Sequence, residues 1–315
     1  MTIDVVVPTF NRWELTETCL QDLAAQTVEH RVIVSDDGSS DDTPARVREA
    51  FPDATVVESE RNSGFATACN RGVAAGAGKF VVLLNNDVRP RTDFLERLVA
   101  PLERDERVGS VAALLVRPDD RTIDSVGLAA DSTLAGFPRL AGRPVAEAAS
   151  EQPALAGPSG GAAAYRRAAW EDVGGLDEAI FFYLEDLDLA LTLRAAGWTA
   201  AAAPDATAVH LGSATAGGRS APMRFNSGFS RAYLLRRYGL LRTRVAPRAV
   251  ATETLVSLAD LALSRDLAAT RGRLAGWRAA GAGLPRPRPP GDAVEGRIGF
   301  LGSLRLRWQD VASPR

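Results

Sequence analysis

Short apolar runs rich in β-branched residues alternate with helical patterns through the first hundred residues, and this alternation constrains the fold more than any other feature. The pattern predicts strands at 3–7, 31–35, 54–58, 79–84 and 108–116 and helices at about 12–26, 42–50, 64–75 and 92–104. Because the strands are continuously apolar, they are expected to be buried on both faces. The chain is therefore predicted to adopt an α/β fold with a mostly parallel sheet and helices on both of its faces.

Polar, aromatic or glycine-rich residues follow each of the first four predicted strands. These segments are 8–12 (PTFNR), 35–39 (SDDGS), 61–65 (RNSGF) and 85–87 (NND). The carboxyl ends of parallel strands meet at one edge of a sheet, where ligands bind in such folds. Turn chemistry explains any one segment, because Asp, Asn, Gly and Ser favour turns. Four segments on the same edge predict a binding cleft.

The stretch FFYLEDLDLALTLRAAGW (181–198) places the carboxylates of Glu185, Asp186 and Asp188 inside an apolar run. The apolar spacing predicts a helix from Asp186 to Ala196, with Asp186 as its N-cap. An acidic cap and first turn that complement the helix dipole explain Asp186 and Asp188 but leave Glu185 unexplained. The residues alone leave a structural cap and a functional role equally open.

The rest of the chain is less regular. Residues 117–160 are rich in Gly, Pro and Ala and are predicted to be loop-like, which is typical of functional or mobile segments. A short strand and a helix are predicted next, and an edge hairpin is expected to end at His210. The pattern becomes helical beyond about residue 219, and 281–292 (GAGLPRPRPPGD) is predicted to be a flexible linker.

Charge divides the chain near residue 218. From Arg219 onward there are 18 Arg and 6 Asp or Glu, a net of +12, whereas the preceding residues carry 19 basic and 33 acidic side chains, a net of −14. This asymmetry predicts an α/β domain at 1–218 and a basic helical extension at 219–315, each with its own partners. No helix-turn-helix or zinc pattern accompanies the arginines, so no nucleic-acid partner is expected.

The cellular compartment is predicted from the membrane and secretion signals that the sequence lacks. It has no run of 18 apolar residues and no basic stretch before an apolar N-terminal core, so neither a transmembrane helix nor a signal peptide is expected. Cys19 and Cys69 lack CxxC spacing and are interpreted as buried thiols in a reducing compartment. A cytoplasmic location is therefore predicted.

Six motifs follow one another along the chain: VVVPTFNR, VSDDGSSDDT, RNSGFATACNRG, LLNNDV, the run from GAAAYRR to LRAAGW, and PDATAVHLGSAT. In this order they closely resemble the GT-A glycosyltransferases of family 2, and most of all the rhamnosyltransferase-like branch. The resemblance covers about residues 3–218. It implies a Rossmann-like GT-A domain that transfers a sugar, rhamnose or similar, from a nucleotide-diphosphate donor to an acceptor hydroxyl with inversion.

The resemblance also implies a donor site. In it, Phe10 and Arg12 line the base and phosphate, Asp37 accepts a hydrogen bond from the pyrimidine N3–H, and Gly160 and Gly161 allow the backbone to approach the donor sugar. The full set of donor-binding residues that it implies is Pro8, Thr9, Phe10, Arg12, Asp37, Asn62, Gly64, Phe65, Asn70, Asn86, Asp87, Gly160 and Gly161.

A divalent cation, Mg²⁺ or Mn²⁺, is implied as the cofactor. The family's DxD metal motif falls on Asn85-Asn86-Asp87, where Asn85 replaces the first carboxylate by a neutral amide. Asp87 is therefore expected to be the principal ligand, with weaker metal affinity than the family pattern gives. His210 matches the histidine that completes the metal site in related enzymes, and an imidazole ligand would favour Mn²⁺.

Inversion requires a base on the face opposite the leaving group. Within the resemblance, Asp186 is the expected general base, and a helix N-terminus is expected to keep it ionised at neutral pH. Glu185 is expected to orient the acceptor or the donor sugar. Asp188 is expected to be structural, either paired with an arginine or capping the helix.

The partners implied are the nucleotide-diphosphate sugar and a saccharide, lipid-linked or natural-product acceptor. The basic extension has three interpretations: contact with an anionic membrane surface, which would place the protein on the inner face of the cell membrane, a cover over the acceptor site, or a homodimer contact. Two other functions stay open. One is a nucleotidyltransferase on a related fold, although its glycine-rich signature is missing; the other is a non-catalytic nucleotide-sugar-binding scaffold, which Asn85 keeps in consideration.

Overall fold

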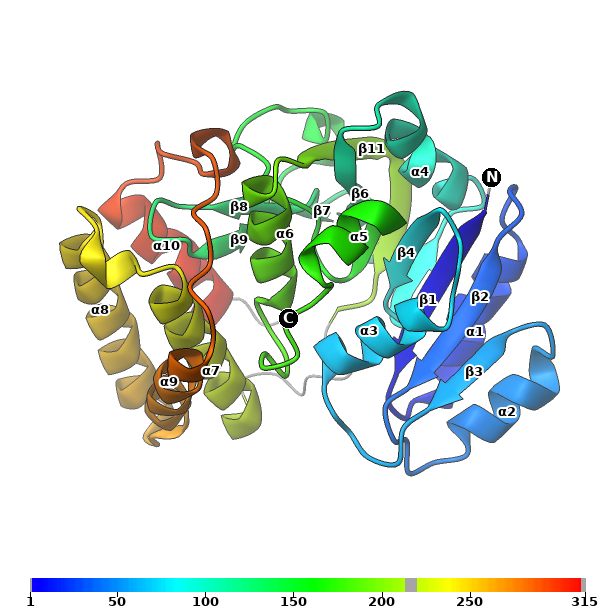
Figure 1. Ribbon diagram of the computed structural model, residues 1–315, viewed down its shortest axis with the longest axis horizontal. Helices are drawn as coiled ribbons and strands as arrows, with labels where there is room; N and C mark the ends of the chain where they lie inside the picture. Colours follow the sequence, from blue (N-terminus) through cyan, green and yellow to red (C-terminus); the bar gives the residue numbers. More distant parts are fainter. Residues whose placement is uncertain (1, 213–219, 313–315) are drawn as a thin grey trace.

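The predicted strands are present, and together with later ones they form one nine-stranded sheet in the computed structural model, which describes residues 2–212 and 220–312 (Figure 1). The order is β3-β2-β1-β4-β10-β6-β11-β5, and β7 pairs with β6. The strands are β1 (Ile3–Thr9), β2 (Arg31–Asp36), β3 (Thr55–Glu58), β4 (Phe80–Leu84), β5 (Val88–Pro90), β6 (Val108–Val116), β7 (Ile123–Ser125), β10 (Ala162–Arg166) and β11 (Thr199–His210).

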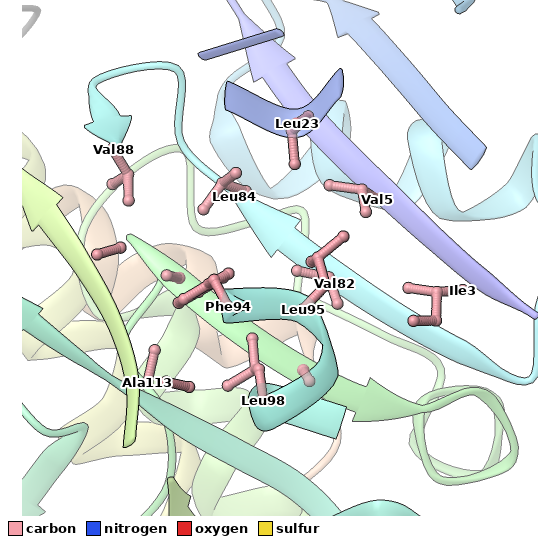
Figure 2. Packing of buried hydrophobic residues seen from close by; sticks show 14 of the residues in the cluster. Ile3, Val5, Leu23, Val82, Leu84, Val88, Phe94, Leu95, Leu98 and Ala113 are labelled. Carbon is pink, nitrogen blue, oxygen red and sulfur yellow. The ribbon is translucent and has the colours of Figure 1, made fainter. Parts of the chain in front are cut away.

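Helices cover both faces of this sheet, as predicted. Alternate side chains of β1 point to opposite sides: Val5 and Val7 belong to the core beneath one set of helices, and Val6 to the core beneath the other. Figure 2 shows the first core, where Leu23, Phe94 and neighbouring side chains pack against the sheet. This face carries α1 (Trp13–Ala24), α2 (Thr43–Ala50) and α4 (Phe94–Arg104), and the other carries α3 (Phe65–Ala74), α5 (Arg167–Val173) and α6 (Glu185–Ala195).

The second half of the sheet differs from the prediction. Strands β1 to β4 are parallel, but β10 is antiparallel to both of its neighbours, β4 and β6, so the sheet as a whole is mixed. The predicted edge hairpin is wrong. Residues 199–210 form one strand between β6 and β5, with a register shift between Ala203 and Thr207. Pro204 in this interval has no N–H to donate, so the chain bulges there and then resumes pairing with β6 instead of turning back.

The segment predicted to be loop-like, 117–160, is more ordered than expected. It contains β7, a separate hairpin of β8 (Leu128–Ala130) and β9 (Gly136–Pro138), and the 3-10 turn η1 (Val145–Glu147). Much of the segment is buried, including Val126 and Phe137. Both cysteines are buried free thiols, as predicted.

The chain beyond residue 220 is helical, as predicted, and forms a cluster at one side of the α/β part (Figure 1). The predicted division at 218/219 falls outside the described residues. None of the helices in the described ranges is long and apolar enough to cross a membrane. The elements are α7 (Ala221–Arg237), η2 (Leu240–Arg242), α8 (Ala246–Ser264), α9 (Ala268–Ala279), η3 (Ala280–Ala282), η4 (Gly291–Ala293) and α10 (Phe300–Ala312).

Helix α6 joins the two parts of the molecule. Its Leu189 and Leu193 pack into the core beside the sheet, whereas Leu187 and Leu191 pack with Tyr233 and its neighbours on α7. A helix that is apolar on both sides in this way is buried between two layers. The first turn of α6 is therefore held in place from two directions.

Candidate active site

A cavity of about 200 Å³ opens at the carboxyl edge of the parallel strands, where the sequence predicts a binding cleft. The segments after β1, β2 and β4 supply most of its walls, together with the loop before α3 and residues 181–182. The lining residues are Pro8, Thr9, Phe10, Asp37, Asn62, Gly64, Phe65, Ala68, Asn85, Asn86, Asp87, Phe181 and Phe182. The strand ends that meet at this edge of the sheet thus bring most of the predicted donor-binding residues together around one cavity.

Asp37 both lines the cavity and holds its wall. Its carboxylate accepts hydrogen bonds from the backbone N–H groups of Ser63 (3.0 Å) and Gly64 (2.8 Å), and Arg71 Nη2 lies 3.4 Å from it. Arg71 also donates to the Asp36 carbonyl oxygen at 2.9 Å. The sequence did not indicate this role of Arg71, because its partners lie more than thirty residues away.

An aromatic wall that the sequence did not predict closes one side of the cavity. The Phe65 N–H donates to the Phe181 carbonyl oxygen at 2.9 Å, and the rings of Phe65 and Phe182 meet edge to face with centroids 6.1 Å apart. Gly64, at φ +96°, permits this approach, because a Cβ there would lie 2.5 Å from the same carbonyl oxygen. The only signal in the sequence was the apolar run just before Glu185.

The Asn85-Asn86-Asp87 turn forms the floor of the cavity. The Asn85 N–H donates to the Gly161 carbonyl oxygen at 3.0 Å, and Asn86 Nδ2 donates to Thr16 Oγ1 on α1, also at 3.0 Å. Asn85 Oδ1 and Asp87 Oδ1 are both buried and accept no hydrogen bond from any described residue. Buried oxygens of this kind are costly unless a ligand or ion completes them.

His210, at the end of β11, lies beside this turn. Its Nε2 is 3.6 Å from Asp87 Oδ2, and its Nδ1 is 2.8 Å from Asp124 Oδ2. Burial lowers the pKa of His210, but the hydrogen bonds and negative charges of Asp124 and Asp87 outweigh burial and raise the pKa to about 9. Asp124, on the short strand β7, was not predicted, because the segment around it was interpreted as a loop.

The residues of this floor fit a divalent cation. They offer two buried oxygens without partners, on Asn85 and Asp87, and an imidazole next to them. The described residues contain no group of three or more His, Cys, Asp or Glu placed to hold a metal by themselves. Mg²⁺ does not require such a group, because it usually keeps several waters and binds through one or two carboxylates together with substrate phosphates.

Helix α6 begins one residue earlier than predicted, and Asp186 is not its N-cap. Leu184 occupies the cap position in a left-handed conformation, φ 66°, and Tyr183 before it has φ 72°. Asp186 instead lies in the first turn, where Oδ1 accepts from the Leu187 N–H (2.7 Å) and Oδ2 from the Gly160 N–H (2.8 Å). Two successive left-handed, non-glycine residues are uncommon, and such backbone strain is concentrated at functional sites.

Asp186 is brought to the edge of the cavity through Gly160. A Cβ on Gly160 would lie 3.5 Å both from Asp186 Oδ2 and from the ring of Phe65, which lines the cavity. The neighbouring residue, Gly161, bonds to the metal-motif turn at Asn85. Gly160 and Gly161 therefore connect Asp186 with the floor of the cavity.

The expectation that a helix N-terminus alone keeps Asp186 ionised needs correction. Burial raises the pKa of Asp186, and the N–H groups of Gly160 and Leu187 oppose this rise. Burial and the adjacent Asp186 charge raise the pKa of Glu185 well above its usual range, and Glu185 Oε2 has no hydrogen-bond partner among the described residues. Of the two carboxyl groups, Asp186 is thus the one that ionises first.

Asp188 has the arginine partner that the sequence predicts. Arg286 Nη2 lies 2.7 Å from Asp188 Oδ2, and Tyr238 donates to Oδ1 at 3.0 Å. Burial raises the pKa of Asp188, whereas Arg286 lowers it. Arg286 belongs to the segment predicted to be a flexible linker, 281–292, so this contact attaches the segment to α6.

Four predicted donor-binding residues do not line the cavity: Gly160 and Gly161, whose contacts are given above, and Arg12 and Asn70. Arg12 is exposed, and its backbone N–H donates to Asp41 Oδ2 at 3.0 Å. Asn70 Nδ2 donates to the Leu176 carbonyl and to Glu178 Oε1, each at 2.9 Å, while its Oδ1 accepts from the Leu176 N–H. The amide of Asn70 is fully used in holding the loop after α5, which leaves it no group to offer a ligand.

Comparison with known proteins adds independent information. The family model described as glycosyl transferase family 2 matches residues 4–174. The N-acetylglucosaminyl-diphospho-decaprenol L-rhamnosyltransferase of Mycobacterium tuberculosis is 30% identical over 202 residues, which are 57% of this chain and 66% of that relative. The chain therefore covers just under two thirds of the length of that relative. The GalNAc(5)-diNAcBac-PP-undecaprenol beta-1,3-glucosyltransferase of Campylobacter jejuni is 33% identical over 90 residues, or 27% of this chain and 29% of that relative.

Solved structures share the fold. The mannosyltransferase PcManGT from Pyrobaculum calidifontis, in complex with GDP-Man and Mn²⁺, has a TM-score of 0.55 at 24% identity and covers 89% of this chain and 75% of its own. The 1–349 structure of TarS from S. aureus has a TM-score of 0.58 at 17% identity, covering 89% of this chain and 80% of its own. These likenesses confirm the predicted GT-A architecture with a helical C-terminal region.

Proposed function

Because the chain belongs to glycosyl transferase family 2, we propose that it is an inverting glycosyltransferase that moves a sugar from a nucleotide-diphosphate donor to an acceptor hydroxyl. The observation that supports this most is the assembly, at one sheet edge, of the cavity, the Asn85-Asn86-Asp87 turn and Asp186. Two of the named relatives have diphospho-polyprenol substrates in their names, and PcManGT is complexed with GDP-Man. A rhamnosyl-type donor and a lipid-linked acceptor are accordingly our proposed substrates.

The donor nucleotide would occupy the cavity. Phe10, which is 39% exposed, offers a ring for the base, and Asp37 offers a carboxylate for an N–H donor. The backbone at Gly64 and the turn at Asn85 lie on other walls of the same cavity. The diphosphate would then lie at the floor of the cavity, where Asn85 Oδ1 and Asp87 Oδ1 have no partner among the described residues.

A divalent cation would be held by Asp87 Oδ1, Asn85 Oδ1 and the imidazole of His210, which would have to give up the proton that its pKa of about 9 retains at neutral pH. When bound, it would supply Lewis-acid stabilisation of the charge that develops on the leaving diphosphate. The contribution of the protein is to keep the Asp87 carboxylate buried and directed by its neighbours, so that its charge acts in a low-dielectric site.

Asp186 is our proposed general base. Two carboxyl groups whose surroundings separate their pKa values are typical of an acid–base pair, and here Asp186 is the one with N–H donors on both oxygens. Burial raises the pKa of Glu185 beside it, and in its protonated form Glu185 would donate a hydrogen bond to a sugar or acceptor hydroxyl. Asp186 would accept the proton of the attacking hydroxyl, and the resulting alkoxide would form the new glycosidic bond while the nucleoside diphosphate departs.

Donor turnover tests the proposed function against its alternatives. We expect hydrolysis or transfer from a dTDP-, UDP- or GDP-sugar, stimulated by Mn²⁺, and a rise in melting temperature with the donor that binds. A scaffold would show the rise in melting temperature without turnover. A nucleotidyltransferase would instead release pyrophosphate from a nucleoside triphosphate.

Asp37→Asn is expected to weaken nucleotide binding by about tenfold, because a hydrogen bond to a charged group contributes about 1.5–3 kcal/mol. Since Asp37 also accepts hydrogen bonds from Ser63 and Gly64, the melting temperature should fall as well. Arg71→Leu is the control, because it removes the contacts that hold Asp37 and the Asp36 carbonyl but Arg71 does not line the cavity. Equal affinity losses in both variants, measured by calorimetry, would assign Asp37 a structural role only.

Helix α8 supports a membrane contact for the C-terminal extension. Val250, Leu255, Leu258 and Leu261 are between 40% and 58% exposed on one side of the helix. Its Glu253 points inward, where Arg231 and Arg307 each lie 2.6 Å from Oε1. This helix presents leucines to solvent and charge to the protein, the reverse of an ordinary surface helix.

We propose that this leucine face of α8 rests on an anionic membrane. The extension from Arg219 onward carries a net charge of +12, which would attract anionic lipid and would oppose contact between two copies. Leu258→Gln combined with Leu261→Gln should lower binding to phosphatidylglycerol vesicles by about 100-fold or more, because each buried leucine contributes about 1.5–3 kcal/mol. Leu284→Gln, at an 83% exposed residue off this helix, is the control. A wild-type dimer that the double variant dissociates, with no vesicle binding, would show that the face is a subunit contact.

A further inference from the structure

A second cavity, of about 400 Å³, lies away from the candidate active site, at the C-terminal ends of α7 and α9. None of its lining residues is shared with the donor cavity, and within the described part of the chain none of them is acidic. Five are arginines: Arg236, Arg237, Arg242, Arg286 and Arg288.

Two of the five arginines are neutralised by carboxylates behind the wall. Arg286 bonds to Asp188 at 2.7 Å and to Asp177 at 3.1 Å, and Arg237 lies 3.4 Å from Asp177. The two positive and two negative charges cancel. These contacts fix one side of the cavity to α6 and to the loop before it.

The other three arginines have no carboxylate partner in the described ranges. Arg236 lies over the ring of Trp277, 5.3 Å from its centroid, and donates to the Trp277 carbonyl oxygen at 2.6 Å. Arg242 and Arg288 are exposed, and their side chains make no hydrogen bond or ion pair with any described residue. The cavity therefore has a local charge of about +3 that no carboxylate of the described residues compensates.

The backbone at Gly281 and Gly283 packs closely against two of the arginines, Arg236 and Arg237. A Cβ on Gly281 would lie 2.6 Å from Arg236 Nη2, and one on Gly283 would overlap Arg237 Nη1. Glycine at both positions lets residues 281–283 pass directly over the two guanidinium groups. Arg236 and Arg237 are thus held against packed backbone, which fixes their N–H groups at the cavity.

We propose that this cavity binds a phosphate or diphosphate group. Guanidinium groups match phosphate oxygens with pairs of parallel N–H donors, and several of them around a concave site select a multiply charged oxyanion. The oxyanion would accept hydrogen bonds from Arg242 and Arg288 at the open side and from Arg236 beside Trp277. A soluble polyphosphate and the head group of a phospholipid or polyprenyl phosphate share this chemistry.

The test compares two pairs of charge-removing substitutions in the full chain. Arg242→Gln with Arg288→Gln removes the two exposed cavity arginines, and Arg271→Gln with Arg278→Gln removes two exposed arginines of α9 that do not line the cavity. Binding of inorganic pyrophosphate is measured by calorimetry, and binding to vesicles that contain phosphatidic acid by co-sedimentation. Melting temperatures of both variants should match that of the wild type, because neither pair removes a packed contact.

We expect the double variant of Arg242 and Arg288 to bind at least one of the two probes at least tenfold more weakly than the wild type does. The control variant should bind both probes as the wild type does. Loss of pyrophosphate binding alone would identify a soluble polyphosphate as the ligand. Loss of vesicle binding, with pyrophosphate competing for it, would identify a lipid head group. If the cavity pair binds both probes as tightly as the control pair does, the proposal is wrong.

Discussion

Asp186→Asn is expected to lower turnover by about 10² or more, the usual contribution of a general base. Asparagine keeps the shape and one acceptor oxygen, so one of the bonds from Gly160 and Leu187 can persist and the melting temperature should change little. Donor affinity should also persist, because Asp186 stands beside the donor cavity and not among its lining residues. The measurement is single-turnover transfer at saturating donor, together with donor affinity and thermal unfolding.

Asp188→Asn is the comparison for that experiment. Asp188 is buried against Arg286, so its neutralisation leaves a guanidinium without part of its countercharge and should lower the melting temperature. Turnover of the folded enzyme should stay near normal. A fully active Asp186→Asn enzyme would exclude Asp186 as the base, and equal losses in the two variants would point to a structural role of the first turn of α6.

Asp87→Ala is expected to abolish cation-dependent activity. It removes the only carboxylate of the Asn85-Asn86-Asp87 turn, whose Oδ1 is buried without a partner among the described residues. Mn²⁺ binding, followed by electron paramagnetic resonance in the presence and absence of nucleotide, should fall together with turnover. Unchanged metal dependence in this variant would remove Asp87 from the site.

Asn85→Asp is the matched variant at the same turn. It restores a carboxylate where the family pattern has one, and since Mg²⁺ and Mn²⁺ prefer carboxylate oxygens, metal binding should be equal or tighter. The substitution also adds a negative charge near Asp87 and His210, so weaker metal binding would be informative as well. Weaker metal binding in Asn85→Asp would mean that Asn85 Oδ1 is not a ligand.

The parts of the fold that local sequence predicts are those with a clear period. The helices of the first hundred residues begin and end within two residues of the predicted positions, because each has its own apolar face. The strand ends could be placed at one edge because parallel neighbours share a direction. In contrast, the local sequence of residues 199–210 is typical of a hairpin, and it is the pairing with β6 that makes these residues one strand.

The site residues that sequence reasoning missed depend on contacts distant in the chain. Asp124 meets His210 across 86 residues, and Phe181 bonds to Phe65 from a different loop. The start of α6 was misplaced because Tyr183 and Leu184 adopt left-handed conformations that their side chains do not favour. The pKa of Asp186 could not be anticipated either, since burial is set by the packing of α6 between two layers.

The bond between Arg286 and Asp188 spans 98 residues, and this distance bears on how the enzyme is made. During translation Asp188 leaves the ribosome long before Arg286 does, so an early nascent domain lacks the cation that balances this carboxylate. Helix α6 therefore gains this ion pair only at a late stage of synthesis. We expect nascent chains stalled before residue 286 to carry the cavity-lining loops without this ion pair, and to gain activity only after the helical extension has emerged.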